Sequence, residues 1–115
     1  MTVSRRYQRA AFFQEVGLTA RGAAGGKTVV AALARSFDIS LGGVGVFTQA
    51  HLERGQIVQV VFHLHDARRQ AVAETVPGNV VYLRATEDGN QLGIEFLEPI
   101  REDTHPQLLR AIERL

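Results

Sequence analysis

Short apolar segments separated by glycine-rich or polar turns make up most of the chain. These segments are rich in valine, isoleucine and aromatic residues, as is typical of β-strands. We therefore predict strands over residues 10–20, 28–39, 44–48, 56–65, 71–85 and 91–97. The alanine-rich part of residues 28–39 is also compatible with a helix, but its place between glycine-rich turns favours a strand. Pro77 and Gly78 interrupt residues 71–85, which predicts a bulge or an edge position there.

The hydrophobic period changes from two residues to about 3.6 after Pro99, which indicates a helix over residues 104–115. Thr104 and Gln107 have the spacing of a capping box at the start of a helix. The apolar residues expected on one face of this helix are Leu108, Leu109, Ile112 and Leu115. A helix this short needs a packing partner, either the strands or another protein. The whole pattern predicts an all-β fold with a C-terminal helix, as a small, roughly six-stranded antiparallel β-barrel.

The composition is that of one globular domain. The chain has 115 residues, of which 45% are hydrophobic and 22% charged, and this allows a single buried core. Its formal net charge is +1 and 7% of its residues are aromatic, so we expect neither bulk attraction to DNA or RNA nor repeated stacking platforms for single strands. It has no cysteine and no apolar stretch near the ~18 residues of a membrane span. We expect a cytoplasmic protein without membrane insertion.

Two polar groups stand out from this background. The first consists of basic residues near the start of the chain, Arg5, Arg6 and Arg9. The second, residues 38–43, ends the second predicted strand. Asp38 and Ser40 are two residues apart, so an extended backbone places both side chains on one face. The two glycines that follow permit a turn with positive φ and the close approach of a ligand or of another segment. This layout indicates a small polar recognition site.

Two short motifs occur in order along the chain: RxxxR at residues 5–9 and DxSxxG at residues 38–43. Together they resemble the signature of the PilZ domain family, bacterial receptors for the dinucleotide messenger cyclic di-GMP. The resemblance covers almost the whole chain and implies a β-barrel with an N-terminal arm before it and a helix after it. The chain would then consist of a flexible arm, residues 1–9, and a barrel with its helix, residues 10–115.

The resemblance also implies a set of residues that bind cyclic di-GMP: Arg5, Arg6, Arg9, Asp38, Ser40 and Gly43. An arginine guanidinium can donate two hydrogen bonds to guanine O6 and N7 and can pair with phosphate. Asp38 can accept from the guanine N–H groups, Ser40 can donate to phosphate or accept from a base, and Gly43 would leave the ligand's path free. The alternative is that the arginines are solvated and that Asp38 and Ser40 cap a turn.

We expect a receptor and not an enzyme. Ser40 lacks the glycine-flanked elbow of a nucleophile, and His63 and His65 have no evident third ligand for a metal. No catalytic residue, metal or cofactor is expected besides the ligand itself. We expect that binding changes the conformation of the N-terminal arm and passes a signal to an unidentified downstream effector protein. The alternative function is a PilZ-like adaptor for pilus or flagellar proteins that does not depend on the nucleotide.

Overall fold

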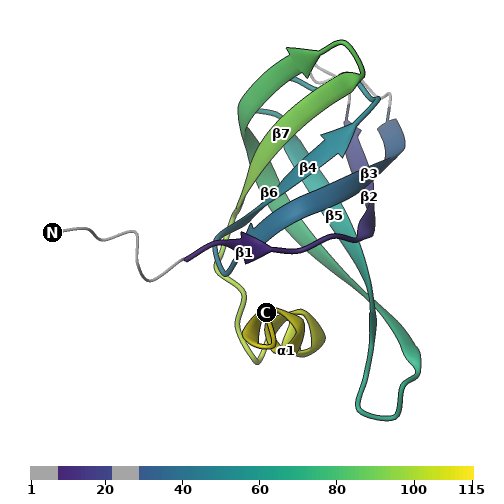
Figure 1. Cartoon of the computed structure of the whole chain (residues 1–115), viewed down its shortest axis with the longest axis vertical. Coiled ribbons are helices and arrows are strands. Elements are labelled where there is room, and N and C mark those ends of the chain that lie inside the picture. Colours follow the sequence, from purple (N-terminus) through teal and green to yellow (C-terminus); the bar gives the residue numbers. More distant parts are fainter. Residues whose placement is uncertain (1–7, 22–28) are drawn as a thin grey trace, which may run out of the picture.

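The computed structural model describes residues 8–21 and 29–115, and Figure 1 shows how their strands and helix are arranged. The strands are β1 (Ala10–Ala11), β2 (Glu15–Arg21), β3 (Val29–Ser40), β4 (Gly43–Thr48), β5 (Ile57–His65), β6 (Ala71–Thr86) and β7 (Gly89–Phe96). The helix that follows them is α1 (Pro106–Glu113). The alanine-rich segment is therefore a strand, and the prediction of an all-β fold with a C-terminal helix is confirmed.

The strands form one antiparallel sheet in the order β1-β3-β2-β5-β6-β7-β4. An additional pairing of β3 with β4 closes strands β2 to β7 into a six-stranded barrel. The first part of β3 pairs with β2, whereas β1 pairs with β3 nearer its end, at Asp38 and Ile39. Closure leaves the long strands with few unpaired edges. The predicted six-stranded barrel is confirmed, with β1 as an extra strand.

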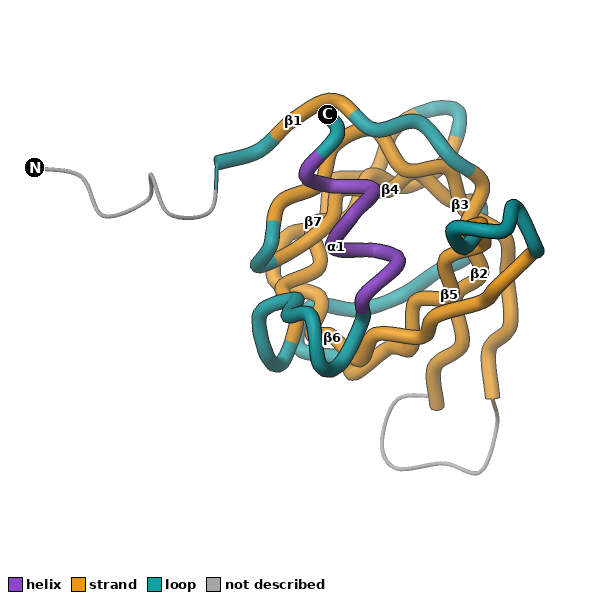
Figure 2. The backbone as a smooth tube through the Cα atoms, turned by 90° about the horizontal axis from the view of Figure 1, so that it is seen from below, coloured by secondary structure: helices purple, strands orange, loops and turns teal. Residues whose placement is uncertain are grey.

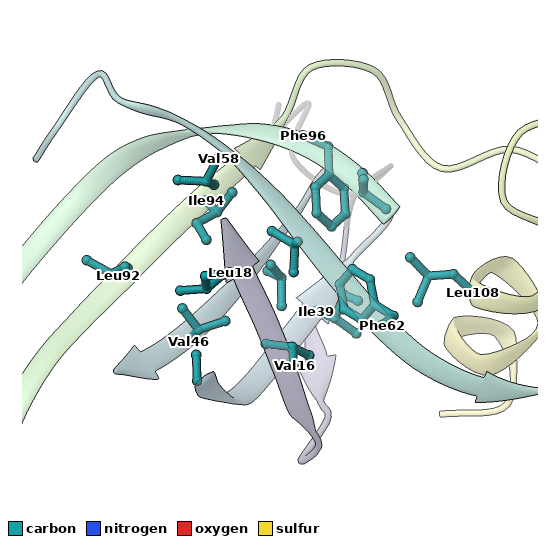
Figure 3. Close-up of a cluster of buried hydrophobic side chains, with 14 of the residues drawn as sticks. Val16, Leu18, Ile39, Val46, Val58, Phe62, Leu92, Ile94, Phe96 and Leu108 are labelled. Atoms are coloured by element: carbon teal, nitrogen blue, oxygen red, sulfur yellow. The ribbon is translucent and has the colours of Figure 1, made fainter. Parts of the chain in front are cut away.

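The core fills the inside of the barrel. Alternation along β5 illustrates how the sequence produces it, because exposed residues alternate there with the buried Val58, Val60, Phe62 and Leu64. Figure 3 shows side chains from several strands and from α1 converging in this cluster. The ring of Phe62 lies 6.4 Å, centroid to centroid, from the rings of both Phe12 and Phe96. A single core of this kind joins strands β2 to β7 and α1.

The strand predicted over residues 10–20 is divided in two, because residues 12–14 leave the sheet between β1 and β2. Ser36 of β3 stabilises this break. Its buried hydroxyl donates to the Phe12 carbonyl at 2.7 Å and accepts from the Gln14 backbone N–H at 3.0 Å. Buried polar groups need hydrogen-bond partners. The Ser36 hydroxyl supplies them to the Phe12 carbonyl and the Gln14 N–H in place of backbone bonds between strands.

The predicted irregularity in β6 lies at a different residue. The register shifts between Val80 and Tyr82, whereas Pro77 is regularly paired with β5. On its other side, Pro77 lies just beyond the β7 ladder, which begins at Gly78, and its carbonyl accepts from the Leu97 N–H at 3.0 Å. In a hydrogen-bonded antiparallel pair, each residue donates one backbone hydrogen bond and accepts another. Proline has no N–H, so Pro77 can only accept. Because β6 lies between β5 and β7 in the closed sheet, Pro77 is not on an edge strand, and a bulge at this position is wrong as well. The missing N–H is tolerated because Pro77 lies just past the end of the β7 ladder.

Helix α1 lies across the lower mouth of the barrel (Figure 2). Leu108 is fully buried there, and Leu109 and Ile112 pack against the core. These residues form the apolar face that the 3.6-residue period predicts. Leu115 does not belong to it, because it follows the last helical residue and its surface is 53% exposed.

The start of α1 is capped from another element. The helix begins at Pro106, so Thr104 comes too early to act as the N-cap, and the predicted capping box is wrong. Glu74 of β6 caps the helix instead. Its Oε2 accepts from the Gln107 N–H at 3.0 Å and its Oε1 from the Leu108 N–H at 2.9 Å. A carboxylate at this end of a helix satisfies free N–H groups and complements the helix dipole.

Candidate ligand-binding site

An open pocket of about 1050 Å³ lies on the outside of the barrel over β3, β4, β7 and β6. These four strands are consecutive neighbours in the sheet (Figure 1). Residues from both sequence motifs line the pocket together with others, among them Arg9, Phe37, Asp38, Ser40, Gly43, Gly45, Asn79, Val81, Tyr82, Gly93 and Glu95. The fold thus brings Arg9 to the end of β3, 29 residues further along the chain.

Asp38 and Ser40 both line the pocket, while Ile39 between them is fully buried in the core. The prediction that the two polar side chains share a face is confirmed. A register shift between Ser36 and Asp38 turns this shared face outward. Ser36 faces inward and is buried, so regular alternation would turn Asp38 inward too. The extra residue, Phe37, restores an outward orientation for Asp38.

Arg9 holds the Asp38 carboxylate with two hydrogen bonds. Its Nε donates to Oδ2 at 2.9 Å and its Nη2 donates to Oδ1 at 2.6 Å. This side-by-side geometry is the favoured contact of a guanidinium with a carboxylate. The pair is partly exposed, with 46% of the Arg9 side chain and 29% of the Asp38 side chain accessible. Solvent therefore screens it, and its main effect is to position the two groups at the pocket.

This pairing sets the charge state of the site. The hydrogen bonds from Arg9 are the main cause that holds the pKa of the Asp38 carboxyl below its usual value. Burial opposes these hydrogen bonds and raises the pKa, while the positive charge of Arg9 and a hydrogen bond from the Gly45 backbone N–H lower it further. The same hydrogen bonds raise the pKa of Arg9. Both groups are charged at neutral pH.

Ser40 is almost completely buried, with 2% of its surface accessible. Its Oγ accepts a hydrogen bond from the Gly42 backbone N–H at 3.1 Å. Ser40 therefore stabilises the turn between β3 and β4, as the alternative interpretation of the motif expects. Its hydroxyl proton is not used in that contact, so the same oxygen remains able to donate to a group in the pocket.

The glycines after Ser40 meet one of the two expectations and not the other. Neither Gly42 nor Gly43 has a positive φ, a conformation found at Gly55 and Gly89. A Cβ on Gly43 would lie 2.5 Å from the Ile94 carbonyl oxygen of β7. Gly43 thus permits the close approach of another segment, strand β7, as expected. The expectation of a positive-φ turn at these positions is wrong.

A row of paired residues crosses the floor of the pocket from β3 to β6. Asp38 is opposite Gly45, Gly45 is opposite Gly93, and Gly93 is opposite Tyr82. A Cβ on Gly45 would lie 2.5 Å from Asp38 Oδ1, and a Cβ on Gly93 would lie 3.0 Å from the Tyr82 Cβ. The two glycines therefore leave room for the side chains at either end of the row.

The sequence contains a partial signal for this row. An isolated glycine inside a strand pattern suggests a bulge or a close approach, and Gly45 and Gly93 are of this kind. Phe37 and Tyr82 carry no such signal, because an aromatic residue is common in any strand. The pairing register that brings them to one pocket is a property of the closed sheet.

Of the residues predicted to bind the ligand, the structure places Arg9, Asp38, Ser40 and Gly43 at the pocket. Arg5 and Arg6, with most of the predicted arm, lie outside the described residues. His63 and His65 are exposed on β5. Within residues 8–21 and 29–115, no three histidine or acidic side chains gather as metal ligands would. Nor does any helix in this part have the length and apolar character needed to cross a membrane.

Comparison with known proteins agrees with this fold and with the two motifs. The family model of the PilZ domain matches residues 4–114, so the chain belongs to the PilZ domain family. A comparison with curated proteins finds no match.

Two solved structures have the same fold. The inhibitor of motility MotI/DgrA of Bacillus subtilis superposes with a TM-score of 0.67 and 18% identity, over 96% of this chain and 50% of that protein. The PilZ domain of YcgR from Escherichia coli, solved with c-di-GMP, superposes with a TM-score of 0.59 and 19% identity, over 96% of this chain and 92% of that domain. This chain thus spans half the length of the Bacillus protein. At such identities the likeness shows the fold alone.

Proposed function

We propose that this chain is a receptor for cyclic di-GMP, which binds in the pocket over β3, β4, β7 and β6. The observation that carries the proposal is the two-bond contact between Arg9 of RxxxR and Asp38 of DxSxxG at the edge of that pocket. It joins two motifs of the PilZ family at one place, and the PilZ domain of YcgR, which has the same fold, was solved with c-di-GMP.

The chemistry of the pocket suits a ligand with two guanines and two phosphates. Arg9 offers a planar set of donors that matches guanine or phosphate. The ionised Asp38 can accept from the N–H groups of a guanine, which a neutral amide oxygen would do less strongly. Ser40 keeps a hydroxyl proton for the ligand. Arg5 and Arg6 belong to this proposed binding set through the family motif.

The proposal includes a conformational change. Arg9 uses its guanidinium on Asp38, so a ligand that binds to both must share or replace these hydrogen bonds. The segment that carries Arg5, Arg6 and Arg9 would then close over the ligand and change the surface beside the pocket. A ligand shifts such an equilibrium only by its differential affinity for the two arrangements. An effector protein that reads this surface would receive the signal.

Calorimetric titration with cyclic di-GMP tests the proposal. We expect saturable binding by the wild-type chain and weaker binding by Arg9→Ala and Asp38→Ala. Loss of a charge-assisted hydrogen bond should weaken binding by about 1.5–3 kcal/mol. Arg68→Ala is the matched control, because Arg68 is exposed on the turn between β5 and β6 and does not line the pocket.

Absence of binding heat from the wild type at high ligand concentration would contradict the proposal. Equal affinity of the wild type, Arg9→Ala and Asp38→Ala would also contradict it, because the ligand would then bind elsewhere. An effector that binds the wild type equally well with and without the nucleotide would instead support the nucleotide-independent adaptor.

A further inference from the structure

We propose that Phe37 and Tyr82 form the two walls of a slot that takes one flat purine ring, a subsite that neither sequence motif contains. This inference rests on the proposed function, because it specifies how the same pocket would hold a base of its ligand. Both residues line the pocket, and they come from the two strands that border its floor, β3 and β6.

Two β-bulges produce this arrangement. On β3 the register shifts between Ser36 and Asp38, and on β6 it shifts between Val80 and Tyr82. Each shift turns two successive residues toward the pocket where regular alternation would bury one of them. On β6 these are Val81 and Tyr82, each 45% exposed beside the fully buried Val80.

Two glycines lie between the positions of the two aromatic residues in the sheet. Gly45 and Gly93 are paired with each other on β4 and β7, directly between the bulges. A Cβ on Gly45 would lie 2.6 Å from Cε1 and Cζ of Phe37, so the Phe37 ring extends over Gly45. A Cβ on Gly93 would lie 3.0 Å from the Tyr82 Cβ. The Phe37 side chain therefore borders this pair of glycines from one end and the Tyr82 side chain from the other.

The strand spacing is compatible with a flat ring in this slot. The Phe37 ring extends over β4, whose backbone lies two strand spacings, roughly 9.5 Å, from that of β6, and a base stacked between two rings needs about 3.5 Å on each face. Aromatic side chains bind bases of any kind by stacking, because every base has a π-face. Specificity for guanine would then come from the polar groups around the slot, and not from the rings.

The first experiment measures the affinity for cyclic di-GMP of Tyr82→Ala, Tyr82→Phe and Phe37→Leu. We expect Tyr82→Ala and Phe37→Leu to bind between about fivefold and a hundredfold more weakly, the range of a lost base–aromatic stack. Tyr82→Phe keeps the ring and should bind as the wild type does. Phe13→Ala is the matched control, since Phe13 is 79% exposed and does not line the pocket. Wild-type affinity in Tyr82→Ala would overturn the slot.

The second experiment leaves both aromatic side chains of the slot, Phe37 and Tyr82, unchanged. The chain has two tyrosines, Tyr7 and Tyr82, so Tyr7→Phe leaves Tyr82 as the single tyrosine in an NMR spectrum. A stacked base shifts the ring protons of Tyr82 upfield. We expect this shift with cyclic di-GMP and, at millimolar concentration, with guanosine monophosphate.

The two ligands, cyclic di-GMP and guanosine monophosphate, allow the slot and the proposed function to be tested separately. Unshifted Tyr82 resonances with both ligands would overturn the slot, even if calorimetry shows that cyclic di-GMP binds. An upfield shift with guanosine monophosphate from a chain that does not bind cyclic di-GMP would support the slot and refute the proposed function.

Discussion

Replacing Gly45 by alanine tests how tightly the pocket floor is built. The added Cβ would lie 2.5 Å from Asp38 Oδ1 and 2.6 Å from two atoms of the Phe37 ring. Ordinary contacts lie near 3.5–4.0 Å, so both side chains must move by about 1 Å. Asp38 resists this movement because Arg9 and the Gly45 N–H hold its carboxylate.

Two effects of opposite sign decide the stability of this variant. Overpacking costs roughly 1–3 kcal/mol. The backbone of Gly45 is not in the positive-φ region, so alanine also removes unfolded-state entropy, which stabilises by about 0.4–1 kcal/mol. We expect a net loss of about 1–2 kcal/mol in the free energy of unfolding. Affinity for cyclic di-GMP should fall as well, because Asp38 is displaced.

Urea unfolding followed by circular dichroism measures this change, with Gly17→Ala as the matched control. Gly17 is also a glycine inside a strand, but its added Cβ would lie 3.5 Å from the Val61 Cβ, an ordinary contact. The control should be neutral or slightly stabilised. If Gly45→Ala unfolds at the same urea concentration as Gly17→Ala, the close packing described for the floor is refuted.

Two further predictions concern the charged contacts. Glu74→Ala removes the acceptor of two N–H groups at the start of α1 and should destabilise the chain by about 1–3 kcal/mol in urea unfolding; the exposed Glu113→Ala serves as control, and equal stability of the two would refute the cap. The pKa of Asp38 is lowered in the folded chain. The ion pair with Arg9 therefore stabilises the fold fully above the unfolded carboxyl pKa of about 3.9. This stabilisation is lost as the pH falls through the lower pKa of the folded chain. An NMR titration should find the Asp38 pKa higher in Arg9→Ala than in the wild type, and an unchanged value would refute the pairing.

The strands and the motif pocket follow largely from local patterns in the sequence. Alternation and turn residues locate the long strands, and the two-residue spacing of Asp38 and Ser40 correctly predicts their common face. These features depend on neighbours in the chain, which a sequence displays directly. The closed barrel then follows from the number of strands and their antiparallel order.

The features that the sequence does not show depend on contacts between distant residues. The cap of α1 comes from Glu74, 33 residues before Gln107, so a search for a local capping box cannot find it. The bulges beside Phe37 and Val81 are shifts in the register between paired strands, so they depend on the partner strand as well as on the local sequence. Because each bulge reverses which residues face outward, alternation alone gives the wrong face for Asp38.

The most direct test of the central claim follows the backbone amides of the glycines by NMR while cyclic di-GMP is added. Gly43, Gly45 and Gly93 line the pocket, whereas Gly17 and Gly55 do not. We expect the amide signals of the first three to move and saturate, and those of Gly17 and Gly55 to stay in place. Signals that remain unchanged at a large excess of ligand, or changes confined to Gly17 and Gly55, would contradict a cyclic di-GMP site over β3, β4, β7 and β6.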